Sequence, residues 1–221
     1  MPEGLINVNG DNVQTLEVLF LTTVIALLPS ILVMMTSFTR IIISLSFLRS
    51  AMGTQQNPPN MVLVGIALFL TLFIMNPVLT EIQKNAYEPY KQQTITQEQA
   101  LDRAEVPLKR FMLRQTEQSS LNMFCDLAQV DAPASEEEAM ELSMRVVVPS
   151  YMTSELKRAF EIGFFLYIPF MLIDIVVSST LMSMGMIMLP PAMISMPFKL
   201  LLFVTVDGWQ LLFSTLAQGF R

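Results

Sequence analysis

Histidine is absent from this 221-residue sequence, and cysteine occurs once, at Cys125. A single cysteine cannot form a disulfide within the chain, and a zinc site built on cysteine and histidine lacks its ligands. Nucleophilic sites that pair serine or cysteine with a histidine base are excluded for the same reason. The sequence therefore predicts a protein that is not an enzyme and has no catalytic site, metal site or cofactor.

Charged residues are also scarce. They make up 14% of the chain, against roughly 25% in an ordinary soluble domain, whereas 52% of the residues are hydrophobic. The mean hydropathy is +0.52. The net charge is −6, but almost all charged residues lie in one central block, and the basic stripe typical of a nucleic-acid-binding protein is missing. This composition predicts a membrane protein that does not bind nucleic acid.

The N-terminal stretch MPEGLINVNGDNVQTLE contains no lysine or arginine. It therefore lacks the basic region that begins a secretory signal peptide. Two interpretations stay open: insertion through the first apolar segment, or prior removal of a signal peptide.

Four long apolar runs dominate the chain, over residues 16–48, 61–79, 159–189 and 198–216. The first, as one straight helix, would be about 50 Å long, whereas a bilayer core is about 30 Å thick. The first and third runs must therefore kink, tilt or project beyond the lipid, and Pro29 and Pro169 are the natural bends. We predict an all-α membrane-associated protein of kinked helical hairpins. Its predicted parts are residues 1–79 (N-terminal segment and first hairpin), 80–157 (hydrophilic helical block) and 158–221 (second hairpin).

The hydrophilic block carries signals for three short helices. The segments Thr96–Gln99 and Ser135–Glu138 have capping-box spacing, and Pro107 suits the first turn of a separate helix between them. The basic residues Arg40, Arg49 and Lys199 lie near the connections after the first and third runs. By the positive-inside rule they place those connections in the cytoplasm, and hence the hydrophilic block on the outer face.

Ionisable residues also interrupt the apolar runs at Arg40, Asp174 and Asp207. A carboxylate at the centre of a bilayer costs at least a few kcal/mol, so these helices are expected to face other protein. Arg40 either snorkels at the end of a span or pairs with an acidic residue on another helix. Asp174 with Asp207 is formally the pair of an intramembrane protease, but glycine-rich surroundings are missing. The same two residues suit a proton-coupled transporter, although the internal repeats usual in transporters are not evident.

Residues 181–200, LMSMGMIMLPPAMISMPFKL, are the stretch hardest to explain as ordinary structure. The first methionines alternate with other residues, and three prolines argue against a continuous helix. Irregular backbone at membrane depth must be packed by protein or line a cavity. Flexible methionine side chains either seal a narrow opening or fill an irregular core. The six methionines are Met182, Met184, Met186, Met188, Met193 and Met196.

Five strings carry a family resemblance: VMMTSFTRIII (33–43), ALFLTLFIMNPV (67–78), FMLRQT (111–116), SELKRAFEIGF (154–164) and MPFKLLLFVTVDGWQLL (196–212). They resemble the FliP family, the P subunit of the bacterial flagellar type III export gate, which is related to the R subunit of injectisomes. The resemblance runs in order from about residue 15 to the C-terminus.

The resemblance implies that several copies of the chain assemble with the Q and R subunits and other membrane proteins of the export apparatus. Together they form a helical, conical gate in the flagellar basal body. The gate lies at the inner membrane and projects to its outer face. Unfolded flagellar proteins pass through its axial pore. The alternative function is a proton-coupled membrane transporter that uses Asp174 and Asp207.

The resemblance also implies roles for particular residues. The family's pore loop maps onto Gly185–Pro191, with Ile187 in place of the middle methionine. The expected pore gasket is Met182, Met184, Met186, Ile187, Met188, Met193 and Met196, with Met186 and Met188 as the best candidates to reach the axis. Among the expected subunit-contact charges, Glu155 and Lys199 are expected to form a contact within or between subunits, and Arg40 to pair with Asp174 or Asp207.

Overall fold

The structure is a computed structural model that describes residues 5–8, 11–14, 19, 22–23, 26–27, 30–31, 33–186 and 188–220. Pro29, the predicted bend of the first apolar run, and Ile187 of the predicted gasket lie outside these residues. Between residues 33 and 220, all the regular elements of the described residues are helical, as predicted. Two short antiparallel strands, β1 (Leu5–Val8) and β2 (Asp11–Gln14), precede them and were not predicted.

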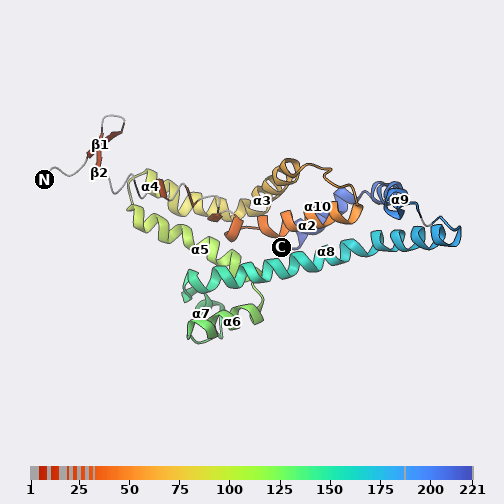
Figure 1. The fold of residues 1–221 in the computed structure, drawn as a ribbon. Coiled ribbons are helices and arrows are strands. Elements are labelled where there is room, and N and C mark those ends of the chain that lie inside the picture. The colour runs from red at the N-terminus through yellow and green to blue at the C-terminus, as the bar shows by residue number, and fades with distance from the viewer. Residues whose placement is uncertain are drawn as a thin grey trace.

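One long helix, α8, runs beside several of the others (Figure 1). It contacts α2, α5, α6 and α9. With 40 residues, it is about 60 Å long at about 1.5 Å per residue. The helices in chain order are α2 (Phe38–Met52), α3 (Asn60–Ile82), the π-helical turn η1 (Gln83–Tyr87), α4 (Glu88–Lys91), α5 (Gln97–Gln115), α6 (Gln118–Ala128), α7 (Glu136–Glu141), α8 (Met144–Ser183), α9 (Pro191–Thr205) and α10 (Gly208–Gln218).

The hydrophilic block differs from the prediction in two respects. The capping box between Thr96 and Gln99 is formed, and Ser135 caps α7. Pro107, however, lies inside α5 and does not start a separate helix. In addition, α8 begins at Met144 and runs without interruption through the predicted boundary at residues 157/158 and through Pro169. The hydrophilic block and the second hairpin therefore share one continuous helix.

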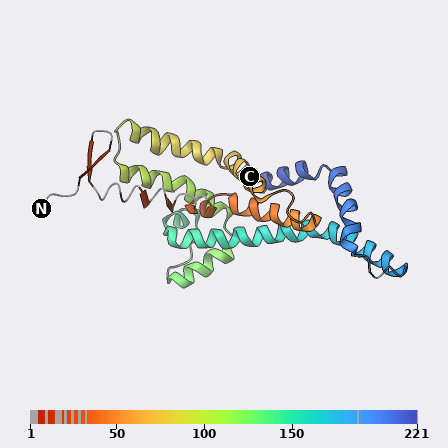
Figure 2. The same cartoon turned by 45° about the horizontal axis from the view of Figure 1, so that its top comes forward.

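The last apolar run is broken rather than continuous. Helices α9 and α10 meet at an angle of 62°, visible in the blue segment of Figure 2. Asp207 occupies the left-handed region at the break, with φ of 50°. The next residue is Gly208. A Cβ atom there would lie 2.2 Å from a ring carbon of Phe203, so a larger residue would clash with that ring. The predicted mid-run carboxylate is thus a helix-break residue.

Among the described residues, two continuous helical stretches are long and apolar enough to cross a membrane, Asn60–Lys91 and Met144–Ser183. The bent pair of α9 and α10 adds a third if it forms one span. Large apolar side chains project outward from these stretches, among them Phe69 at 77% exposure and Phe164 at 62%. Apolar exteriors of this kind suit a helix that faces lipid or other subunits rather than water.

The principal core forms around α2. Ile41, Leu45, Leu48 and Met52 recur at helical spacing, so they share one face, and all four are buried. They belong to a cluster that also takes in Leu63 and other buried residues from α3, α8, α9 and α10. Helix α2 is therefore the central element, against which α3, α8 and α9 pack.

Candidate functional site: the methionine-rich turn and its ion pairs

The methionine-rich turn connects α8 to α9 and has a defined backbone. The amide of Met186 donates to the carbonyl of Leu181 and the amide of Gly185 donates to that of Met182, both at 3.0 Å. With Gly185 at φ of 76°, these bonds form a Schellman motif, which ends a helix at a residue that tolerates the left-handed conformation. Pro190 and Pro191 then begin α9, where a proline costs no helical hydrogen bond. Both helix ends at the turn are therefore encoded locally.

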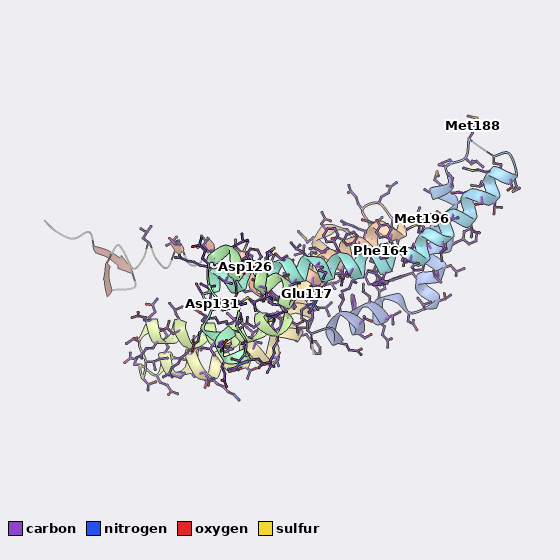
Figure 3. All side chains as sticks on the ribbon, turned by 90° about the horizontal axis from the view of Figure 1, so that it is seen from below. Glu117, Asp126, Asp131, Phe164, Met188 and Met196 are labelled. Carbon is purple, nitrogen blue, oxygen red and sulfur yellow. The ribbon has the colours of Figure 1, made fainter. Side chains whose placement is uncertain are left out.

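The turn lies at one end of the molecule, and most of its methionine side chains are exposed on the surface. Figure 3 shows Met188 at the tip, far from Asp126 and Asp131 in the hydrophilic block. Five side chains are exposed, so they do not fill the core of this chain; Met196 is half-buried. The exposed fractions are 97% for Met188, 70% for Met182, 69% for Met193, 62% for Met184 and 40% for Met186.

A buried lysine holds the two helices of the turn together. The ammonium of Lys199 on α9 donates to Oδ2 of Asp174 on α8 at 2.7 Å and to the carbonyl of Ala51 at 3.0 Å. The hydroxyl of Ser195 donates to Oδ1 of Asp174 at 2.6 Å. Ala51 lies in the last turn of α2, where a cation satisfies unpaired carbonyls and the negative end of the helix dipole. One side chain thus connects three helices.

A second buried cation, Arg40, lies deeper in the core. Its Nε donates to Oε2 of Glu155 at 2.8 Å, and its Nη2 donates to Oε1 of the same carboxylate. The side chains are only 3% and 0% exposed. Such a two-point contact between guanidinium and carboxylate fixes relative orientation as well as distance. The ion pair therefore sets how α2 lies on α8.

The end of the chain closes over this ion pair. Nη1 of Arg40 donates to the carbonyl of Gly219 at 3.1 Å, and the guanidinium carbon lies 3.7 Å from the ring centroid of Phe220. Gln115 on α5 accepts from both Arg40 and Arg158, at 3.2 and 2.9 Å. A guanidinium over an aromatic face gains electrostatic attraction. The residues after α10 are thereby tied to the same point as α2, α5 and α8.

Comparison with known proteins decides the family. A family model described as the FliP family matches residues 21–216. The chain belongs to the FliP family. The similar curated proteins compared below are each named flagellar biosynthetic protein FliP, and membership places this chain among the components of flagellar biosynthesis.

Three relatives illustrate the likeness. The protein of Pectobacterium carotovorum is 53% identical over 96% of this chain and 82% of its own length. The protein of Bacillus subtilis is 50% identical over 94% of this chain and 92% of its own length. The protein of Aquifex aeolicus is 46% identical over 96% of this chain and 88% of its own length. The likeness therefore extends over nearly all of the chain.

The ion pairs of this FliP-family chain differ from those predicted. Glu155 pairs with Arg40 rather than with Lys199, and Asp174 pairs with Lys199 rather than with Arg40. The cause is placement along α8: Asp174 lies toward the turn, beside α9, whereas Glu155 lies beside the start of α2. Asp207 is exposed at the α9–α10 break, and no ion pair within the described residues involves it.

Several partners of these charges escaped sequence analysis. Gln115 and Phe220 complete the surroundings of Arg40, and Ser195 completes those of Asp174. Gln115 lies within FMLRQT, one of the strings that carries the resemblance, which was a usable signal. No pattern in the sequence pointed to Phe220, because a single aromatic residue near Arg221 has no distinctive spacing.

Removing one partner of the buried Arg40–Glu155 pair should destabilise the fold strongly. Glu155→Gln leaves a buried guanidinium without its counter-charge, and we expect it to lower the free energy of unfolding by about 3–5 kcal/mol. The matched control is Glu117→Gln, which breaks the more exposed Lys157–Glu117 pair and should cost about 0–1 kcal/mol. Denaturant unfolding in mild detergent measures both. Equal stability of the two variants would contradict this role for the buried pair.

Proposed function

We propose that this FliP-family chain, a component of the flagellar export apparatus, is a structural and gating subunit of the protein-export channel. Several copies assemble with the Q and R subunits in the bacterial inner membrane and surround an axial pore for unfolded flagellar proteins. The hydrophilic block faces the outer side of the membrane. The observation that carries the proposal is the methionine-rich turn: a cluster of exposed thioether side chains at the tip of a firmly anchored hairpin.

The chemistry of the turn suits a deformable seal. Methionine side chains are flexible and polarizable, so several of them can close a narrow opening and still adapt to a passing chain. Such a seal needs a rigid support, since side chains on a mobile hairpin would not meet at one axis. The Asp174–Lys199 pair supplies this support, because it bridges α8 and α9 roughly 13 Å along each helix from the turn.

The dimensions of α8 support assembly with other subunits. At about 60 Å, the helix is about twice as long as a bilayer core is thick. Its outer face carries Phe160, Phe164 and Phe165, each exposed in the single chain. Lipid cannot cover apolar side chains along the whole of such a helix. Neighbouring copies and the Q and R subunits are the proposed cover for the part outside the bilayer.

The alternative of a proton-coupled transporter is less well supported. A proton relay needs carboxylates that load and release protons along one path. The carboxylate of Asp174 is instead engaged by Lys199 and Ser195, whereas Asp207 is exposed at a helix break. The two residues therefore occupy different kinds of environment.

Separate asparagine substitutions distinguish the two functions. Asp174→Asn weakens the anchoring of Lys199, and we expect a loss of about 1–2 kcal/mol in stability, because hydrogen bonds to charged groups are worth about this much at a partly exposed site. Asp207→Asn should change stability by less than about 0.5 kcal/mol, since asparagine also tolerates the left-handed region. Unfolding in detergent and flagellar export by cells measure the effects. Loss of export in both variants, with assembly intact, would favour the transporter.

The seal itself is tested by shortening the methionines. Replacing both Met186 and Met188 by alanine removes thioether side chains from the tip without touching the main-chain bonds of the turn. We expect the closed gate, reconstituted with its Q and R subunits in vesicles, to leak a small fluorescent dye while the complex still assembles. Met123→Ala, an exposed methionine on α6, is the control. Vesicles that stay as tight as the control would contradict the gasket.

A further inference from the structure

We infer that the methionine-rich turn is also a site of reversible oxidation, at which conversion of Met186 and Met188 to sulfoxides unseals the gate. This inference rests on the proposed gating function. It names a chemical modification of the same residues and a consequence for the seal.

Exposure distinguishes the methionines of the turn from those buried in the core. Met188 is 97% exposed, whereas Met112, Met75 and Met52 are between 0% and 3% exposed. Oxidants in solution reach an exposed sulfur atom directly, and a methionine sulfoxide is polar where the thioether was apolar. The turn is therefore the densest group of oxidisable side chains along the described sequence, with five exposed thioethers between residues 182 and 193.

The oxidant proposed is a hypohalous acid. The sulfur lone pair attacks the oxygen of the hypohalous acid and forms the sulfur–oxygen bond. The oxygen–halogen bond breaks, halide leaves with the electron pair, and the hydroxyl proton passes to water. The thioether is thus oxidised to a sulfoxide while the halogen is reduced to halide. Methionine sulfoxide reductases reverse the change.

Oxidation should alter the seal without unfolding the hairpin. The Schellman motif is made of main-chain hydrogen bonds and the conformation of Gly185, not of sulfur contacts. The Asp174–Lys199 pair lies away from the turn along both helices. Only the surface of the tip changes, from apolar thioethers to sulfoxides that attract water. A wetted constriction then conducts small solutes.

The experiment uses the gate purified with its Q and R subunits and reconstituted in dye-loaded vesicles. Hypochlorite is added, sulfoxides are located by peptide mass spectrometry, and dye release is followed. The matched control is the double variant Met186→Leu, Met188→Leu. Leucine is apolar and close to methionine in volume, but it has no sulfur to oxidise. Met61, exposed at 87% near the start of α3, is present in both proteins.

The inference predicts sulfoxides at Met186 and Met188 before any at Met112, and a several-fold rise in dye release. It also predicts that a methionine sulfoxide reductase restores the seal, and that hypochlorite raises dye release less in the leucine variant than in the unaltered gate, each compared with its own release before oxidation. An oxidised gate that stays tight, an equal rise in release from the leucine variant, or no sulfoxide at the turn would overturn it. If the unoxidised alanine variant leaks but the oxidised gate does not, only the oxidation inference fails. If neither leaks, the gating function fails as well.

Discussion

The buried ion pair between Arg40 and Glu155 is the constraint on which the other contacts of this chain depend. Burying two charges costs several kcal/mol each, and their attraction offsets that cost only when the geometry is good and further hydrogen bonds complete it. Gln115 and the carbonyl of Gly219 supply those bonds, and the ring of Phe220 covers the guanidinium. The pair thereby fixes α2 against α8 and draws α5 and the chain end to the same point. Since Lys199 also contacts the last turn of α2, the position of the methionine-rich turn follows from the position of α2.

The distribution of polarity in the hairpins is the reverse of that in a soluble protein. Charged side chains are buried at Arg40, Glu155 and Lys199, whereas large apolar side chains face outward from α3 and α8. An exterior of this kind needs lipid or protein around it. A helix of the length of α8 extends beyond a bilayer, so both kinds of cover are expected. The exposed methionines at the tip belong to the same pattern. They are the apolar surface that, in the proposed gate, faces the pore.

Much of the helical architecture could be predicted from the sequence, because hydrophobic runs and capping residues are local signals. The capping box at Thr96 and the helix cap at Ser135 were predicted correctly. The pairing of charges could not be predicted, because it depends on which distant helices lie beside one another. From the sequence alone, Arg40 and Lys199 could each pair with Glu155 or Asp174. The break at Asp207 was not predicted, although the Asp207–Gly208 dipeptide is a turn signal. The Asn9–Gly10 dipeptide between β1 and β2 is a strong hairpin signal that was overlooked.

In the proposed gate, this chain is one of several subunits around a shared pore. The most direct measurement is the mass and subunit content of the complex, extracted in mild detergent from cells that also produce the Q and R subunits. Light scattering and mass spectrometry of the purified particle give both quantities. The account predicts a particle that contains several copies of the 24.9 kDa chain together with Q and R subunits. A stable monomer that carries neither subunit would contradict it.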